Sequence, residues 1–193
     1  MLEDYGLFPI ETAAFTKILP KLFRMLEKAV GETFRPFAPK CLYTSSNPVT
    51  IIMEDLNTQD FKLATVTHGL DLKHCLMVMR TIAQYHAASM VLHSQNPDLF
   101  KPYMEMVGNK NAEVGMKAYF SLCVRSLRQH VEKWPGYEKH AENLQKIEPN
   151  AFEAWHGSML RDDKAFNVPL HGDLWLNNLM FRYSEKDQLE DIR

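Results

Sequence analysis

Three polar residues of the C-terminal quarter have types and spacing suited to phosphoryl transfer. His171, Asp173 and Asn178 follow the pattern His-x-Asp-x-x-x-x-Asn. A carboxylate beside a nucleophilic hydroxyl can orient it and accept its proton, and this is the role predicted for Asp173. Asn178 would offer a side-chain carbonyl oxygen to Mg²⁺, His171 would hold the loop backbone, and Gly172 would permit the tight turn.

Other interpretations of the same residues stay open at this point. Gly-Asp followed by Asn-Asn is ordinary turn chemistry, in which Asp173 would be only a turn carboxylate. A metal-dependent phosphoesterase could use His171 and Asp173, but it would need further His and Asp ligands in tight motifs. The other histidines of the sequence form no such motif. The spacing itself is that of a kinase catalytic loop.

The elements that must position this loop can be predicted from the hydrophobic pattern. Helical spacing predicts helices over residues 8–31, 71–94, 111–133, 137–146 and 150–160. Strand-like runs predict one hairpin from 40–44 with 49–53 and a second from 179–183 with 189–193. Pro20 should kink or split the first helix, and the apolar segment 168–173 should lead as a strand into the loop. Because strands and helices do not alternate, the predicted class is α+β.

Composition excludes several classes of protein. The 193 residues are 46% hydrophobic and 24% charged, with 22 Lys and Arg against 24 Asp and Glu. This near-balance gives no bulk electrostatic signal for nucleic acid or an anionic membrane, and no apolar run is long enough to span a bilayer. Cys41, Cys75 and Cys123 are far apart and form no Cys-x-x-Cys pair, which favours a reducing compartment. We expect a cytoplasmic monomer.

The loop and its surroundings resemble a known family. Residues 170–178, Leu-His-Gly-Asp-Leu-Trp-Leu-Asn-Asn, look like the catalytic loop of the ecdysteroid kinase-like (CHK kinase-like) family. These small-molecule kinases are expanded in insects and are related in fold to choline and aminoglycoside kinases. Trp175 stands where protein kinases usually carry Lys. The resemblance also includes residues 8–20, 51–56 and 83–89, in the expected order.

This resemblance implies a protein kinase-like fold with two lobes. A partial N-lobe would occupy residues 1–56, and a partial C-lobe with the catalytic loop 171–178 would occupy residues 57–193. Glu11 would be the acid that pairs with the phosphate-binding Lys. Glu54 and Leu56 would belong to the hinge that holds adenine through backbone groups.

The implied reaction is ATP-dependent and Mg²⁺-dependent transfer of the γ-phosphoryl group to an alcohol on a steroid-like or xenobiotic small molecule. The sequence, however, contains no Gly-rich phosphate loop, no strand with the phosphate-binding Lys and no Asp-Phe-Gln motif for the second Mg²⁺ ligand. Asp191 is not assigned that role. We therefore expect a fragment with little activity alone, and the alternative is a non-catalytic, pseudokinase-like binding module.

Overall fold

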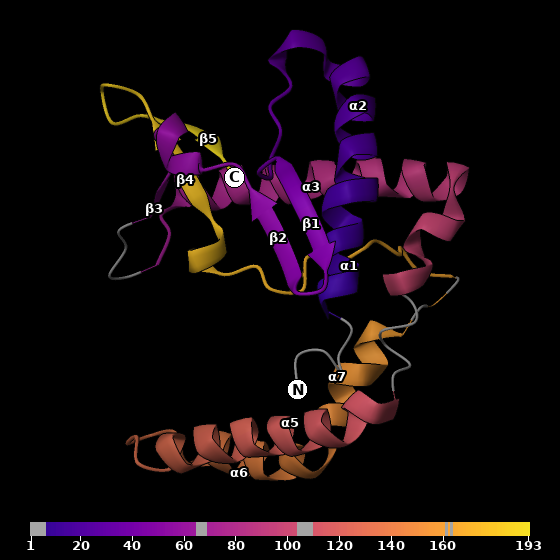
Figure 1. Cartoon of the computed structure of the whole chain (residues 1–193). Helices are drawn as coiled ribbons and strands as arrows, with labels where there is room; N and C mark the ends of the chain where they lie inside the picture. The colour runs from indigo at the N-terminus through magenta and orange to yellow at the C-terminus, as the bar shows by residue number, and fades with distance from the viewer. Residues whose placement is uncertain (1–6, 65–68, 104–109, 161, 163) are drawn as a thin grey trace. The chain divides into compact units, whose positions relative to one another are not determined.

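The computed structural model describes residues 7–64, 69–103, 110–160, 162 and 164–193 (Figure 1). These residues form two compact units. One contains the described residues between Phe8 and Lys101 together with Asn167–Arg193, and the other contains Leu7 and the described residues between Pro102 and Phe166. The first unit holds all the candidate site residues, and the second is helical. The predicted lobe boundary between residues 56 and 57 stays a prediction.

The first predicted helix is present but is split. It consists of α1 (Leu7–Ala13), a π-helical turn η2 (Ala14–Ile18) and α2 (Leu19–Val30). Pro20 has no N–H to donate to the carbonyl of Thr16, so the regular ladder cannot continue there. The Leu19 N–H instead donates to the carbonyl of Ala14, five residues back. The split predicted at Pro20 is therefore confirmed. The irregular backbone lies in the turn that precedes the proline.

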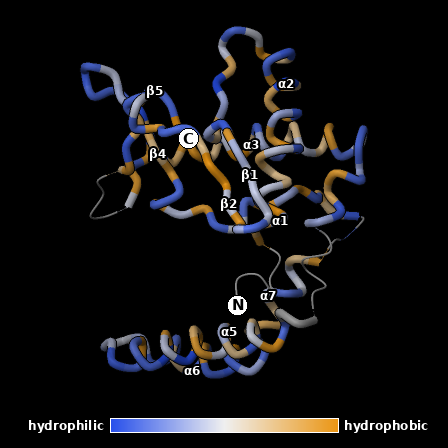
Figure 2. The backbone as a smooth tube through the Cα atoms, in the orientation of Figure 1, coloured by the Kyte–Doolittle hydropathy of each residue, from blue (hydrophilic) through white to orange (hydrophobic). Residues whose placement is uncertain are grey.

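The predicted first hairpin is confirmed. It pairs β1 (Cys41–Ser46) with β2 (Val49–Met53) in antiparallel register. Asn47 and Pro48 join the strands, as expected for residues that favour turns. β2 carries the longer apolar run (Figure 2). After it, Asp55 caps the short 3-10 turn η4 (Leu56–Gln59) by accepting a hydrogen bond from the backbone N–H of Asn57, at 3.0 Å.

The second sheet joins the chain after η4 to the chain after the candidate catalytic loop. Its strands, in spatial order, are β3 (Lys62–Leu63), β4 (Met180–Tyr183) and β5 (Leu189–Ile192), and both pairings are antiparallel. The hairpin of β4 and β5 was predicted. β3 was not, because two residues are too few to show an alternating pattern.

α3 (Leu72–Gln95), the long horizontal helix of Figure 1, packs against β5 and α2. Asp71 caps its start by accepting a hydrogen bond from the backbone N–H of His74. The His74 side chain also bonds Asp71, at 2.7 Å, and the hydroxyl of Tyr183, at 2.8 Å. The hydrophobic core between α3 and the second sheet consists of Val78, Leu179, Phe181 and Ile192. This core holds β4, the strand that leaves the catalytic loop.

His86 of α3 is half-buried. Burial lowers its pKa. The core of this helix is made instead by Val78, Ala88, Ser89 and Leu92.

The helical unit contains the three remaining predicted helices: α5 (Lys110–Val131), α6 (Glu138–Ile147) and α7 (Ala151–Met159). Phe120 of α5 packs on Trp155 of α7 with ring centres 4.9 Å apart. Arg125 and Glu148 form an ion pair at 2.7 Å between α5 and the turn before α7. Across the residues that the structure describes, no helix combines the length and apolar character needed to cross a membrane.

Candidate active site

The candidate catalytic loop has little regular structure. Residues 167–175 form bends and extended backbone, η7 (Leu176–Asn178) is a short 3-10 turn, and β4 follows. The prediction of a strand over 168–173 was wrong. Pro169 has no N–H to donate to a ladder, and no neighbouring strand in the described part of the chain pairs with this segment.

Asp173 and Asn178, predicted as base and metal ligand, are in direct contact. The Asn178 side-chain nitrogen Nδ2 donates to the Asp173 backbone carbonyl and to its carboxylate Oδ2, each at 2.8 Å. Both side chains are exposed. The two N–H bonds of the amide are thereby used, and its carbonyl Oδ1 accepts no hydrogen bond within the described residues. That oxygen is the atom that a cation would take.

His171 and Gly172 shape the turn before Asp173. The Asp173 backbone N–H donates to His171 Nδ1 at 3.3 Å. The catalytic role of His171 stays a prediction. Gly172 has φ +83°, in the left-handed region that side chains other than hydrogen disfavour. After the turn, the Trp175 N–H donates to the Asp173 carbonyl at 3.2 Å. The aspartate backbone is therefore held from both sides, while its carboxylate stays accessible.

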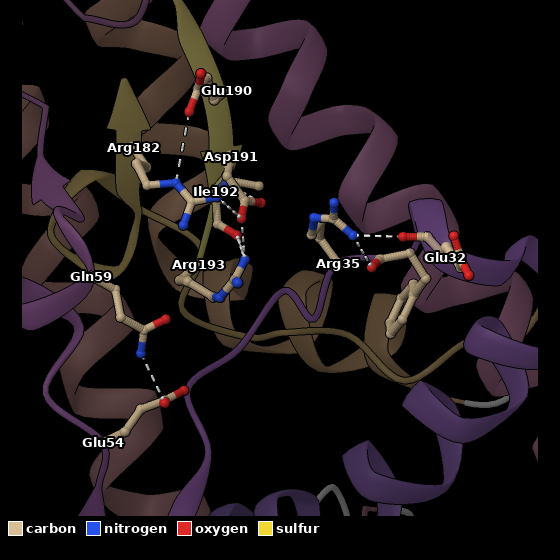
Figure 3. A network of polar contacts seen from close by, with 10 residues as sticks. Glu32, Arg35, Glu54, Gln59, Arg182, Glu190, Asp191, Ile192 and Arg193 are labelled. Carbon is tan, nitrogen blue, oxygen red and sulfur yellow. Dashed lines mark hydrogen bonds and ion pairs between the residues drawn. The ribbon is translucent and has the colours of Figure 1, made fainter. Parts of the chain in front are cut away.

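The side chain of Glu54, one of the two predicted hinge residues, is anchored by two hydrogen bonds. Glu54 Oε1 accepts a hydrogen bond from the Lys40 backbone N–H at 2.8 Å. Its other oxygen, Oε2, accepts one from Gln59 Nε2 at 2.9 Å (Figure 3). Leu56 is buried, and its carbonyl accepts from the Phe61 N–H at 3.2 Å. The structure thus gives the Glu54 carboxylate a structural task, which the sequence did not indicate. Contact of the hinge backbone with adenine stays a prediction.

Glu11 lies exposed on α1. Among the described residues it makes no ion pair. Its pairing with a phosphate-binding Lys therefore also stays a prediction.

A buried charge cluster at the C-terminal hairpin was not foreseen. Asp191 is 7% exposed and accepts hydrogen bonds from Arg193 Nη1, at 3.0 Å, and Arg182 Nη2, at 3.3 Å (Figure 3). Its carboxylate is thus occupied by two guanidinium groups. The only sequence signal for this cluster was the presence of opposite charges on the two strands of the predicted hairpin. In the structure, Arg182 lies directly across from Asp191.

The donor set of the loop suits a hydrated Mg²⁺ carried by nucleotide phosphates. No group of three or more His, Cys, Asp or Glu among the described side chains could hold a metal ion by itself. Asp173 and Asn178 offer one carboxylate and one amide oxygen. Mg²⁺ is commonly bound by one or two such groups together with phosphates and water.

Comparison with known families gives one result for the whole chain. The model of the ecdysteroid kinase-like family matches residues 1–193. No curated protein and no solved structure matches the chain.

Proposed function

The chain belongs to the ecdysteroid kinase-like family, and on that premise we propose that its catalytic loop serves ATP- and Mg²⁺-dependent phosphoryl transfer to an alcohol. Membership supports a kinase-like phosphotransferase and a kinase-like fold. The observation that supports the finer proposal is the double hydrogen bond between Asn178 and Asp173. It places a carboxylate and a free amide oxygen side by side at an exposed turn.

Asp173 acts on the acceptor alcohol in this proposal. Its carboxylate accepts a hydrogen bond from the hydroxyl and so aims the oxygen at the γ-phosphorus. The new bond joins the alcohol oxygen to phosphorus, the bond from phosphorus to the ADP oxygen breaks, and the proton passes to Asp173 and then to water. Orientation and late proton acceptance do not require a raised carboxylate pKa.

Asn178 holds the other side of the site. Its amide hydrogens fix the Asp173 carboxylate, and its carbonyl oxygen would be a ligand to Mg²⁺. The ion supplies neutralisation of negative charge on the transferring phosphoryl group. His171 holds the backbone of the loop, and Glu54 holds the backbone proposed to contact adenine.

The acceptor is proposed to be a small-molecule alcohol, steroid-like or xenobiotic, and this choice rests on family membership. We also propose that the 193 residues alone transfer phosphate slowly. Their sequence includes no Gly-rich loop to grip the phosphates.

The test compares the chain with Asp173→Asn, using labelled ATP, Mg²⁺ and a panel of ecdysteroids, choline, ethanolamine and plant alcohols. Nucleotide binding is measured in parallel by calorimetry. We expect Mg²⁺-dependent ATP binding in both proteins, and slow transfer to an alcohol only in the unsubstituted chain. Transfer unaffected by Asp173→Asn would contradict the role of Asp173.

Two further outcomes separate the alternatives. Nucleotide binding without transfer to any alcohol would favour the pseudokinase-like module. Absence of both Mg²⁺-dependent binding and transfer would contradict the kinase proposal altogether.

A further inference from the structure

Arg193 is a buried cation whose guanidinium contacts a carboxylate, a backbone carbonyl and an aromatic ring. Its side chain is 8% exposed, and Nη1 donates to Asp191 Oδ2 at 3.0 Å and to the Ile192 carbonyl at 2.9 Å. Its guanidinium carbon lies 4.6 Å from the centre of the Phe61 ring. Burial lowers the pKa of Arg193, and the adjacent Asp191 carboxylate opposes that shift. Asp191 therefore helps to keep a desolvated guanidinium charged.

The backbone of Arg193 holds the strand that leaves the catalytic loop. The Arg193 N–H donates to the Met180 carbonyl at 2.8 Å, and the Met180 N–H donates to the Arg193 carbonyl at 2.9 Å. Met180 comes two residues after Asn178, and on its other side it pairs with Leu63 of β3. A displacement of Arg193 would therefore reach Asn178 through a short, hydrogen-bonded stretch of chain.

Phe61 belongs to the turn at the predicted hinge. Its ring is fully buried, and its backbone N–H closes the turn by donating to the Leu56 carbonyl. Arg182 also lies over this ring, with its guanidinium carbon 5.0 Å from the ring centre. Cation–π contacts are strongest when they are desolvated, and of the two cations over the ring it is Arg193, with a side chain 8% exposed, that meets this condition.

We propose that Arg193 is a positioning residue that joins the hinge turn to the catalytic loop. Its side chain contacts Phe61 at one end, and its backbone holds Met180 at the other. This link fixes the separation between the backbone proposed to bind adenine and the amide proposed to bind the metal. The consequence for nucleotide rests on the proposed function, whereas the mechanical link does not.

The link can be tested in the protein without ligand by NMR of the Asn178 side-chain amide, assigned by its loss in Asn178→Ser. Arg193→Lys keeps a positive charge beside Asp191 but replaces the planar guanidinium. Phe61→Leu removes the ring and keeps an apolar side chain. In both variants we expect the Asn178 amide resonances to shift towards those of a free amide, and their exchange with water to become about tenfold faster.

Tyr183→Phe is the matched control. It lies on the same hairpin and loses the hydrogen bond to His74, and among the described residues no ring contact joins it to Phe61. It should lower stability while leaving the Asn178 resonances in place. Unchanged resonances in folded Arg193→Lys and Phe61→Leu would overturn the proposal, as would an equal shift in Tyr183→Phe.

A second measurement separates this proposal from the proposed function. Adenosine contacts only the hinge, whereas Mg²⁺·ATP also engages the loop. In Arg193→Lys and Phe61→Leu, adenosine affinity should stay within about twofold, while the extra affinity for Mg²⁺·ATP should fall about tenfold. If the unsubstituted chain binds neither ligand, the proposed function fails, and the amide resonances alone still decide whether Arg193 positions the loop.

Discussion

Asn178 is joined to Asp173 by two hydrogen bonds from one nitrogen atom, one to the backbone carbonyl and one to the carboxylate, each 2.8 Å long. The spacing of five residues and the 3-10 turn η7 bring the two side chains together. The amide therefore fixes the aspartate, while its own oxygen accepts no hydrogen bond from the part of the chain that the structure describes.

Replacing Asn178 with Ala should weaken Mg²⁺-dependent ATP binding about tenfold, because both the proposed ligand oxygen and the support for Asp173 are lost. Asn177→Ala is the matched control, since the neighbouring Asn177 side chain makes no hydrogen bond within the described residues. Calorimetric titration with ATP, with and without Mg²⁺, measures both variants. Equal weakening in the two variants would contradict the ligand role of Asn178.

Two glycines should respond to alanine in opposite directions. Gly172→Ala should lower the free energy of unfolding by about 1 kcal/mol, because φ is +83° there and a Cβ is strained even in open space. Gly157→Ala, within α7, also meets no atom within 4 Å and should raise it by about 0.5–1 kcal/mol. Urea denaturation measures both changes. A higher free energy of unfolding in Gly172→Ala would contradict the prediction and would show that the turn adopts another backbone conformation.

Glu54→Gln should destabilise the hinge by about 1–2 kcal/mol and weaken adenosine binding. Both carboxylate oxygens accept hydrogen bonds, and the NH₂ group of Gln would instead face a donor. Glu32→Gln is the control, because Glu32 is exposed and, within the described residues, only its backbone carbonyl accepts a hydrogen bond. Urea denaturation and adenosine titration should show an effect at Glu54 alone.

Alkaline pH should destabilise the protein through Tyr103. Burial raises the pKa of Tyr103 to about 12 from its ordinary value of 10.0. Above about pH 10 the unfolded chain loses the Tyr103 proton, whereas the folded chain keeps it. The free energy of unfolding is therefore unaffected below about pH 10 and decreases as the pH rises towards 12. Tyr103→Phe should flatten this decline in urea denaturation between about pH 9 and about pH 12. An unchanged decline would show that Tyr103 is not responsible.

Local signals predicted most of the elements. Asp71 at the start of α3 and Asn96-Pro97 at its end carry the cap and stop chemistry in the sequence itself. Asp173 and Asn178 were identified from their spacing of five residues, although their mutual hydrogen bonds were not predicted. The ends of α3 depend on residues that are close together in the sequence, so the sequence pattern was sufficient to predict them.

The rest depends on partners distant in sequence. β3 exists only because Lys62 and Leu63 meet Phe181 and Met180. The burial of Arg193 requires Phe61, and the role of the Glu54 carboxylate requires Lys40. Such pairings come from the packing of the fold, and composition and periodicity do not encode them visibly.

The π-helical turn between α1 and α2 also determines which way Glu11 faces. The buried positions Ala13, Ile18 and Leu22 are five and then four residues apart, so the turn contains one residue more than an α-helix would. That extra residue puts α1 out of phase with α2 by about 100°. Deleting one residue from the turn would restore the phase and rotate Glu11 about the helix axis by the same angle. The length of this turn, rather than any contact of its own, therefore orients the carboxylate.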